Sequence, residues 1–146
     1  MPTGQRPESS QSGELVLRAP DPQAGGSWGA RVYTSRAGTE CILVGWLRGV
    51  TLGRVEGSRF RPYPPEVTGS CGSLPRTQFF FAVTPHAEPQ PRTLVYGRAG
   101  VDVQTLRVND GERIRQVRPG PDGAFLLVLE GDVSPPQVQV RPVNGE

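Results

Sequence analysis

The chain has 146 residues, which matches one domain of ordinary size and excludes a large multidomain assembly. Its 19 glycines and 16 prolines make up about 24% of the sequence, just below the share at which unperiodic sequences are disordered. Val, Leu, Ile and Phe supply about another 24%, enough apolar surface for a folded core. The formal net charge is +2, so no field across the whole domain favours nucleic acid or an anionic membrane.

The N-terminal segment and the apolar runs bear on location. Residues 1–13 carry no apolar side chain after Met1, which predicts a disordered leader without the apolar stretch of a secretory signal. The longest apolar runs, residues 41–44 and 124–129, are far shorter than the roughly 20 residues of a membrane-spanning helix, so no membrane span is predicted. Two locations stay open: the cytosol, or a compartment outside it that is reached through a signal or anchor removed ahead of Met1.

From Leu15 onward, short apolar runs alternate with clusters of Gly, Pro, Asp, Asn and Ser. No long stretch keeps a helical period without Gly or Pro. The pattern predicts an all-β, sandwich-like single domain over residues 14–146, with about ten short strands. The candidate strands are residues 14–18, 28–35, 39–47, 49–55, 58–61, 77–83, 92–97, 101–108, 112–117, 124–129 and 136–141.

Two turns and two strands carry more specific predictions. Asn-Asp-Gly at residues 109–111 predicts a hairpin in which Gly111 takes a positive φ. Pro-Asp-Gly at residues 121–123 predicts a second turn. The strand that follows at residues 124–129 is apolar on both faces and is therefore predicted to be central. Residues 135–141 alternate after two prolines, which predicts a strand with one wet face near an edge.

Three prolines between Thr84 and Pro91 predict an extended, exposed connector. It could separate two lobes, but the roughly 50 residues after it would form a marginal core alone, so one domain is preferred. His86, the one histidine in the sequence, falls in this connector and is predicted to be a surface residue. A hydrolase would have to use His86 with a distant nucleophile, because Ser70 has no base beside it in the sequence.

The sequence offers no pattern for a metal or a cofactor. Two cysteines and one histidine give no zinc-ligand spacing, and no glycine-rich phosphate loop is present. We therefore predict no catalytic residues, no metal, no cofactor and no nucleotide chemistry.

Paired arginines are the candidate ligand-binding residues. Arg59 and Arg61 flank Phe60, and Arg113 and Arg115 flank Ile114, so each pair is expected on one strand face with the apolar residue on the other. The pairs could grip a polyanion, although the wet face of an amphipathic strand explains them as well.

Phe79, Phe80 and Phe81 alternate faces, so one side of their strand must present an aromatic ring to a second sheet or a partner.

Cys41 and Cys71 are predicted to form a disulfide. Cys41 lies in an apolar strand, and Cys71 lies in a glycine-flanked loop whose backbone can adapt to the bond. The alternative is two reduced thiols in a cytosolic protein. Location therefore depends on the state of this pair.

Several segments together resemble a known group of domains. They are residues 28–35, 38–45, 70–74, 94–97 and 121–126. Over roughly residues 28–131 the chain resembles uncharacterised β-sandwich (Ig-like) domains of actinobacteria. The resemblance implies an extracytoplasmic location behind an N-terminal anchor, which this sequence lacks, and it brings no catalytic residues.

We therefore expect a non-enzymatic interaction or structural module, extracytoplasmic or associated with the cell surface. Its partner is expected to be a protein or a component of the cell envelope, and not nucleic acid. The alternatives are a polyanion-binding domain that uses the arginine pairs, and a hydrolase that uses His86.

Overall fold

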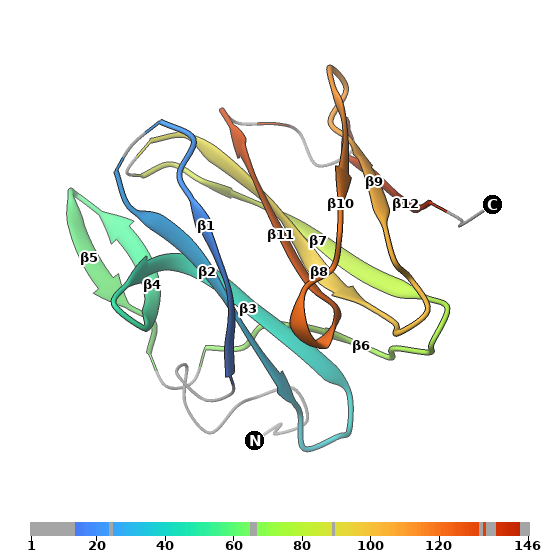
Figure 1. Cartoon of the computed structure of the whole chain (residues 1–146). Helices are drawn as coiled ribbons and strands as arrows, with labels where there is room; N and C mark the ends of the chain where they lie inside the picture. Colours follow the sequence, from blue (N-terminus) through green and yellow to red (C-terminus); the bar gives the residue numbers. More distant parts are fainter. Residues whose placement is uncertain are drawn as a thin grey trace.

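Three antiparallel β-sheets are stacked side by side, with sheet B between sheets A and C (Figure 1). The structure, a computed structural model, describes residues 14–23, 25–64, 67–88, 90–131, 133 and 137–143. Sheet A has the order β1-β2-β3-β4-β5 with β6 paired to β3, sheet B has the order β11-β8-β7, and sheet C has the order β10-β9-β12. The predicted all-β, sandwich-like fold is confirmed, and the predicted leader lies outside the described residues.

The strand bounds follow the chain through the three sheets. Sheet A contains β1 (Glu14–Pro20), β2 (Ser27–Thr34), β3 (Glu40–Arg48), β4 (Thr51–Glu56), β5 (Arg59–Pro62) and β6 (Ser70–Gly72). Sheet B contains β7 (Phe79–His86), β8 (Arg92–Ala99) and β11 (Ala124–Glu130). Sheet C contains β9 (Leu106–Asn109), β10 (Ile114–Val117) and β12 (Gln139–Pro142). A 3-10 turn, η1 (Pro121–Gly123), precedes β11.

The interface between sheets A and B is built from alternate residues of neighbouring strands. Trp28 and Ala30 of β2 and Ile42 of β3 point toward Leu94 and Tyr96 of β8. Because residues two apart on a strand share a face, Val95, between Leu94 and Tyr96, points the other way. β8 therefore needs a second cover on its far side.

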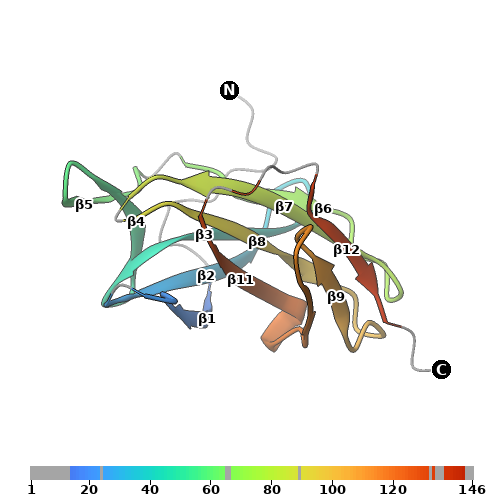
Figure 2. The same ribbon diagram turned by 90° about the horizontal axis from the view of Figure 1, so that it is seen from above.

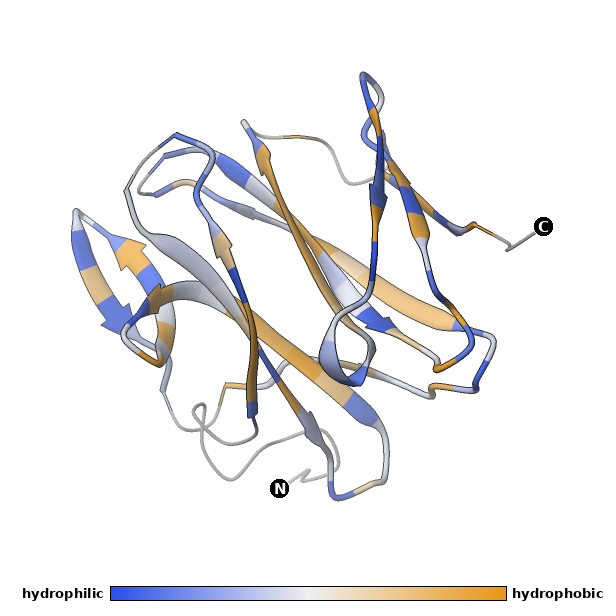
Figure 3. Cartoon of the chain, viewed as in Figure 1, coloured by the Kyte–Doolittle hydropathy of each residue, from blue (hydrophilic) through white to orange (hydrophobic). Residues whose placement is uncertain are grey.

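Sheet C provides that cover. Val95 of β8 and Phe125 and Leu129 of β11 form a second core with Leu106 and Val108 of β9. All eight residues of β8 are buried as a result. Figure 3 shows apolar residues concentrated on β3, β8 and β11.

The prediction that the strand at residues 124–129 is the central strand of its sheet was wrong. β11 is an outer strand of sheet B, and β8 is the central one. Its two apolar faces arise because sheet A lies on one side and sheet C on the other. Phe80 on β7 packs into the core between sheets A and B, and Phe79 packs into the core between sheets B and C. Of the two alternatives predicted from the three phenylalanines, a second sheet or a partner, these two rings meet a second sheet, whereas Phe81 is 39% exposed.

The predicted connector after Thr84 was also wrong. Thr84, Pro85 and His86 belong to β7, where His86 is paired with Arg92 of β8. Proline is tolerated here because β7 is an outer strand of sheet B and its missing N–H leaves the ladder to β8 intact. The two strands form a hairpin, so the proline-rich segment does not separate two lobes.

The predicted Asn-Asp-Gly hairpin is confirmed between β9 and β10. Gly111 has a φ of 98°, and the backbone N–H of Asp110 donates to the carbonyl of Arg113 at 3.1 Å. Burial raises the pKa of Asp110, but backbone N–H groups of Arg113 and Glu112 outweigh it by donating to this carboxylate and hold the pKa below its usual value. β12 forms the other edge of sheet C with Val140 buried and Arg141 exposed, as predicted for an edge strand with one wet face.

A buried ion pair joins sheets A and B at one end of β8. The guanidinium of Arg92 donates to both carboxylate oxygens of Asp21, at 3.0 and 2.8 Å. The indole N–H of Trp28 donates to the same carboxylate at 2.9 Å. The side chains of Arg92 and Asp21 are 3% and 0% exposed, and the hydrogen bond to Asp21 raises the pKa of Arg92.

The structure contains the predicted disulfide between Cys41 and Cys71. The two residues are direct cross-strand partners in β3 and β6, with Cα atoms 4.1 Å apart. Cys71 therefore lies in a short strand rather than in the predicted loop. The bond ties β6, which has three residues, to the middle of sheet A.

We expect Asp21→Asn to lower the free energy of unfolding by about 3–5 kcal/mol, because it leaves the guanidinium of Arg92 buried without a countercharge. Asp102→Asn is the matched control, since it breaks an exposed pair with Arg76 and should cost no more than about 1 kcal/mol. Urea unfolding of both variants measures the difference. Similar losses for the two variants would contradict a special role for the buried pair.

We expect reduction of the disulfide to lower the free energy of unfolding by about 3.5–4 kcal/mol, because the bond closes a loop with a sequence separation of 30 in the unfolded chain. Denaturant unfolding with and without reductant measures this. The Cys41→Ala/Cys71→Ala variant should be insensitive to reductant. Alkylation of denatured, non-reduced protein should add no label, and two labels would show free thiols.

Candidate functional site

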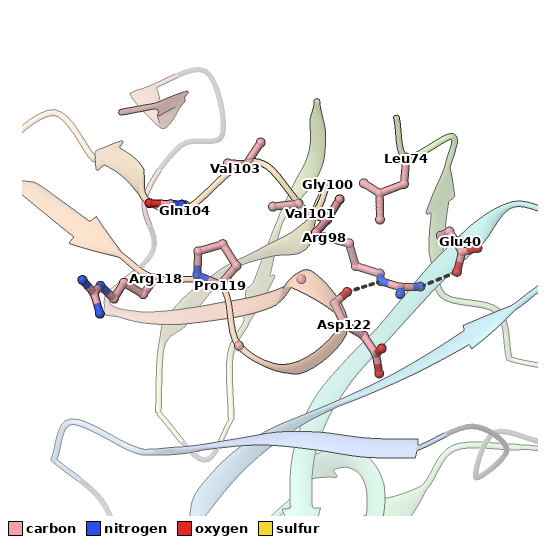
Figure 4. A pocket seen from close by; sticks show the side chains of 13 residues that line it. Glu40, Leu74, Arg98, Gly100, Val101, Val103, Gln104, Arg118, Pro119 and Asp122 are labelled. Carbon is pink, nitrogen blue, oxygen red and sulfur yellow. Dashed lines mark hydrogen bonds and ion pairs between the residues drawn. The ribbon is translucent and has the colours of Figure 1, made fainter. Parts of the chain in front are cut away.

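A cleft of about 810 Å³ opens at the end of the stack where the β8–β9 loop faces the turn before β11 (Figure 4). Leu74, Val101 and Pro119 contribute apolar side chains to its lining, and Val101 is 68% exposed. Arg118 lies at the rim, and its guanidinium points away from Arg98 (Figure 4). The lining of the cleft thus combines apolar side chains with polar ones such as Gln104 and Arg118.

Arg98, which lines this cleft, holds neighbouring parts of the fold together. Arg98 of β8 donates through Nη1 to Glu40 of β3 at 2.9 Å and through Nε to the carbonyl of Asp122 at 3.1 Å. One guanidinium therefore joins sheet B to sheet A and to the turn before β11. Because these contacts already occupy Arg98, a ligand in the cleft would have to displace Glu40 to pair with the guanidinium of Arg98.

A smaller pocket of about 330 Å³ brings together two residues weighed in the sequence for hydrolase chemistry. Ser70 and His86 both line it, with Tyr63, Tyr96 and Thr84 among the other lining residues. The hydroxyl of Ser70 lies 3.4 Å from the hydroxyl of Tyr96. The hydroxyl of Thr84 is buried without a hydrogen-bond partner among the described residues. The pocket is thus lined by several hydroxyl groups.

His86 is not the surface residue predicted from the sequence. Its ring packs edge-on against Trp28 with the ring centroids 5.1 Å apart, and burial lowers its pKa from 6.5. A histidine base for nucleophilic catalysis needs a hydrogen bond to its nucleophile. Here the hydroxyl of Ser70 contacts Tyr96, and His86 supports Trp28 from the side.

The predicted arginine pairs lie at opposite ends of the molecule. Arg59 and Arg61 are on β5 of sheet A, while Arg115 is on β10 of sheet C and Arg113 directly precedes that strand. Both views of the fold show the separation of β5 from sheet C (Figure 1, Figure 2). The Nε atom of Arg61 lies 3.3 Å from the carboxylate of Glu56. The first pair is therefore partly neutralised.

The second pair differs from the prediction in its orientation. Ile114 is 63% exposed, whereas the side chain of Arg115 is 34% exposed and lies 3.7 Å from the carboxylate of Asp110. Both arginines line a cleft of about 640 Å³ that also contains Asp110, Glu112 and Glu130. β10 thus turns its isoleucine outward, and three carboxylates accompany the two guanidinium groups.

The outer face of sheet C carries five polar side chains that the sequence analysis did not select, together with Ile114. Strand register places six side chains there in two rows. One row is Ile114, Asn109 and Gln139, and the other is Gln116, Arg107 and Arg141.

The two arginines on this face are direct cross-strand partners on β9 and β12, and both are exposed. Within the described part of the chain, neither Arg107 nor Arg141 has a carboxylate within ion-pair distance. A shallow groove of about 210 Å³ runs along the same face. The alternation of polar and apolar residues over 106–109 and 138–141 was the signal that could have found this face.

No family model, curated protein or solved structure matches the chain, so the resemblance to actinobacterial β-sandwich domains stays a prediction. Among the described residues, no helix combines the length and the apolar character needed to cross a membrane. The described His, Cys, Asp and Glu side chains also form no group of three suited to a metal ion.

We expect the stability of the protein to depend on pH through His86. Because burial lowers its pKa in the folded state, the unfolded chain binds a proton more readily below pH 6.5. Its contribution is therefore complete above pH 6.5 and is lost as pH falls through the lower folded pKa. Urea unfolding from about pH 8 to about pH 5 measures this loss.

His86→Phe is the control for this pH dependence, because it keeps an aromatic ring against Trp28 and removes the titration. The variant should show a smaller loss of stability over the same range. Identical pH profiles for the variant and the parent would assign the effect to other groups.

Proposed function

We propose that the protein is a non-enzymatic binding module of an oxidising, extracytoplasmic compartment, and that it holds an anionic partner of the cell surface against the outer face of sheet C. The observation that carries the proposal is the pair formed by Arg107 and Arg141. Like charges that lie directly opposite each other on a sheet repel and are destabilising. An anionic partner removes that repulsion and accepts hydrogen bonds from both guanidinium groups.

The disulfide supports the proposed compartment. Structural disulfides persist in secreted and cell-surface proteins and are rare in the cytosol. The bond between Cys41 and Cys71 ties β6 to β3 beside the first core, so an oxidising environment stabilises the fold that displays the proposed surface.

We expect Arg107→Gln/Arg141→Gln to lose retention on anionic matrices. The parent protein and the variant are compared on carboxylated, sulfated, phosphorylated and neutral agarose. Each charge-assisted contact contributes about 1.5–3 kcal/mol, so losing two should weaken binding by at least tenfold.

Arg18→Gln/Arg36→Gln is the matched control, because it removes the same charge from exposed positions outside sheet C and outside both predicted arginine pairs. It should elute with the parent protein. If the two double variants elute together on every matrix, net charge explains the retention and the proposed function is wrong.

A hydrolase built on Ser70 and His86 is the alternative, favoured by their shared pocket. We expect no turnover of short-chain nitrophenyl esters above the buffer rate, because the hydroxyl of Ser70 is directed to Tyr96. Turnover that Ser70→Ala and His86→Ala both abolish, with unchanged circular dichroism, would establish the hydrolase and overturn the binding module.

A further inference from the structure

We infer that the outer face of sheet C takes a polysaccharide that carries carboxylates on some of its sugar units, with a carboxylate held between Arg107 and Arg141. This inference rests on the proposed function and names the ligand class of the same surface. Three features of the face support it: its size, its mixture of charged and neutral polar groups, and its one exposed apolar side chain.

The size of the face favours a narrow ligand. Its three strands have four residues each, so they cover about 10 Å by 13 Å, on the order of 130 Å². A stable protein interface buries about 800 Å² on each partner. The groove of about 210 Å³ along this face is accordingly suited to a segment of a linear polymer.

The polar groups suit a sparsely charged polymer that is rich in hydroxyls. Arg107 and Arg141 supply planar donors that match a carboxylate in a bidentate manner. Asn109, Gln116 and Gln139 each both donate and accept hydrogen bonds, as sugar hydroxyls do. A polymer with one charge on every unit would instead require a cation at each step along the face.

The exposed apolar side chain is Ile114, which lies in the row of Asn109 and Gln139. Its methyl groups can cover the C–H face of a sugar ring. None of the six side chains on the face is aromatic, whereas binding of single-stranded nucleic acid relies on stacking of bases on aromatic rings. The face therefore favours a sugar polymer over a nucleic acid.

The test measures binding of hyaluronan oligosaccharides, whose carboxylates lie on alternate sugars, by calorimetry. Arg107→Gln and Arg141→Gln should each weaken binding at least tenfold, while Arg36→Gln should stay within twofold of the parent. Carboxyl-reduced hyaluronan should bind at least tenfold more weakly than the native polymer. The salt dependence should be shallow, because about two charges are neutralised.

A second measurement reports on the surface without any substitution. Addition of hyaluronan should shift the side-chain amide signals of Asn109, Gln116 and Gln139 in a nitrogen–proton correlation spectrum. Exposed glutamines elsewhere, such as Gln23, should keep their positions. Because the parent protein is used, the result does not depend on the folding of a variant.

Three outcomes overturn the inference. The proposed function stays in place in each case if retention of the protein on anionic matrices still depends on Arg107 and Arg141. The three outcomes are equal binding of native and carboxyl-reduced hyaluronan, tighter binding of heparin or oligo(dT) with a steep salt dependence, and amide shifts that avoid sheet C. If no anionic matrix distinguishes the arginine variants from their control, the proposed function fails as well.

Discussion

All eight residues of β8 are buried, so the charges at the two ends of this strand must find their partners inside the protein. Arg92 and Arg98 are six residues apart and therefore point to the same side, toward sheet A. Each meets a carboxylate there, Asp21 at one end and Glu40 at the other. An ion pair between the layers gains from low dielectric but carries a large desolvation cost, so its geometry must be well satisfied. The two pairs fix how sheet B lies on sheet A, and the remaining face of sheet B then requires sheet C.

Local chemistry in the sequence was sufficient for features that depend on neighbouring residues. The hairpin at Gly111 was predictable because a positive φ, an Asx contact and two flanking strands lie within a few positions. Burial of both faces of β11 was predictable from its continuous apolar run. The position of β11 at the edge of sheet B was not predictable. A short strand that is apolar on both faces has the same sequence pattern whether it lies between two stacked sheets or in the centre of one sheet.

The proposed binding surface was harder to predict because it depends on register between distant strands. Arg107 and Arg141 are far apart in the chain, and each alone resembles an ordinary solvent-facing residue of an alternating strand. Pairing of β9 with β12 brings them opposite each other. Arg115 and Ile114 show a different limit of the sequence pattern. Alternation predicted that the two side chains lie on opposite faces of the strand, but it did not predict which face is exposed to solvent. His86 was misplaced because three nearby prolines hid an outer strand that tolerates them.

The position of the disulfide also determines how the protein responds to mechanical tension along the chain. Among the described strands, β12 pairs only with β9 and β1 only with β2, so strands at both ends can peel from their sheets one after another. A pulled chain straightens except between Cys41 and Cys71, where the covalent bond withholds the contour length of 30 residues, about 100 Å. The oxidised protein is therefore shorter at full extension than the reduced one, and the difference is set by a single pair of sulfur atoms. For a domain under tension at a cell surface, the redox state of its surroundings would set how far it can stretch.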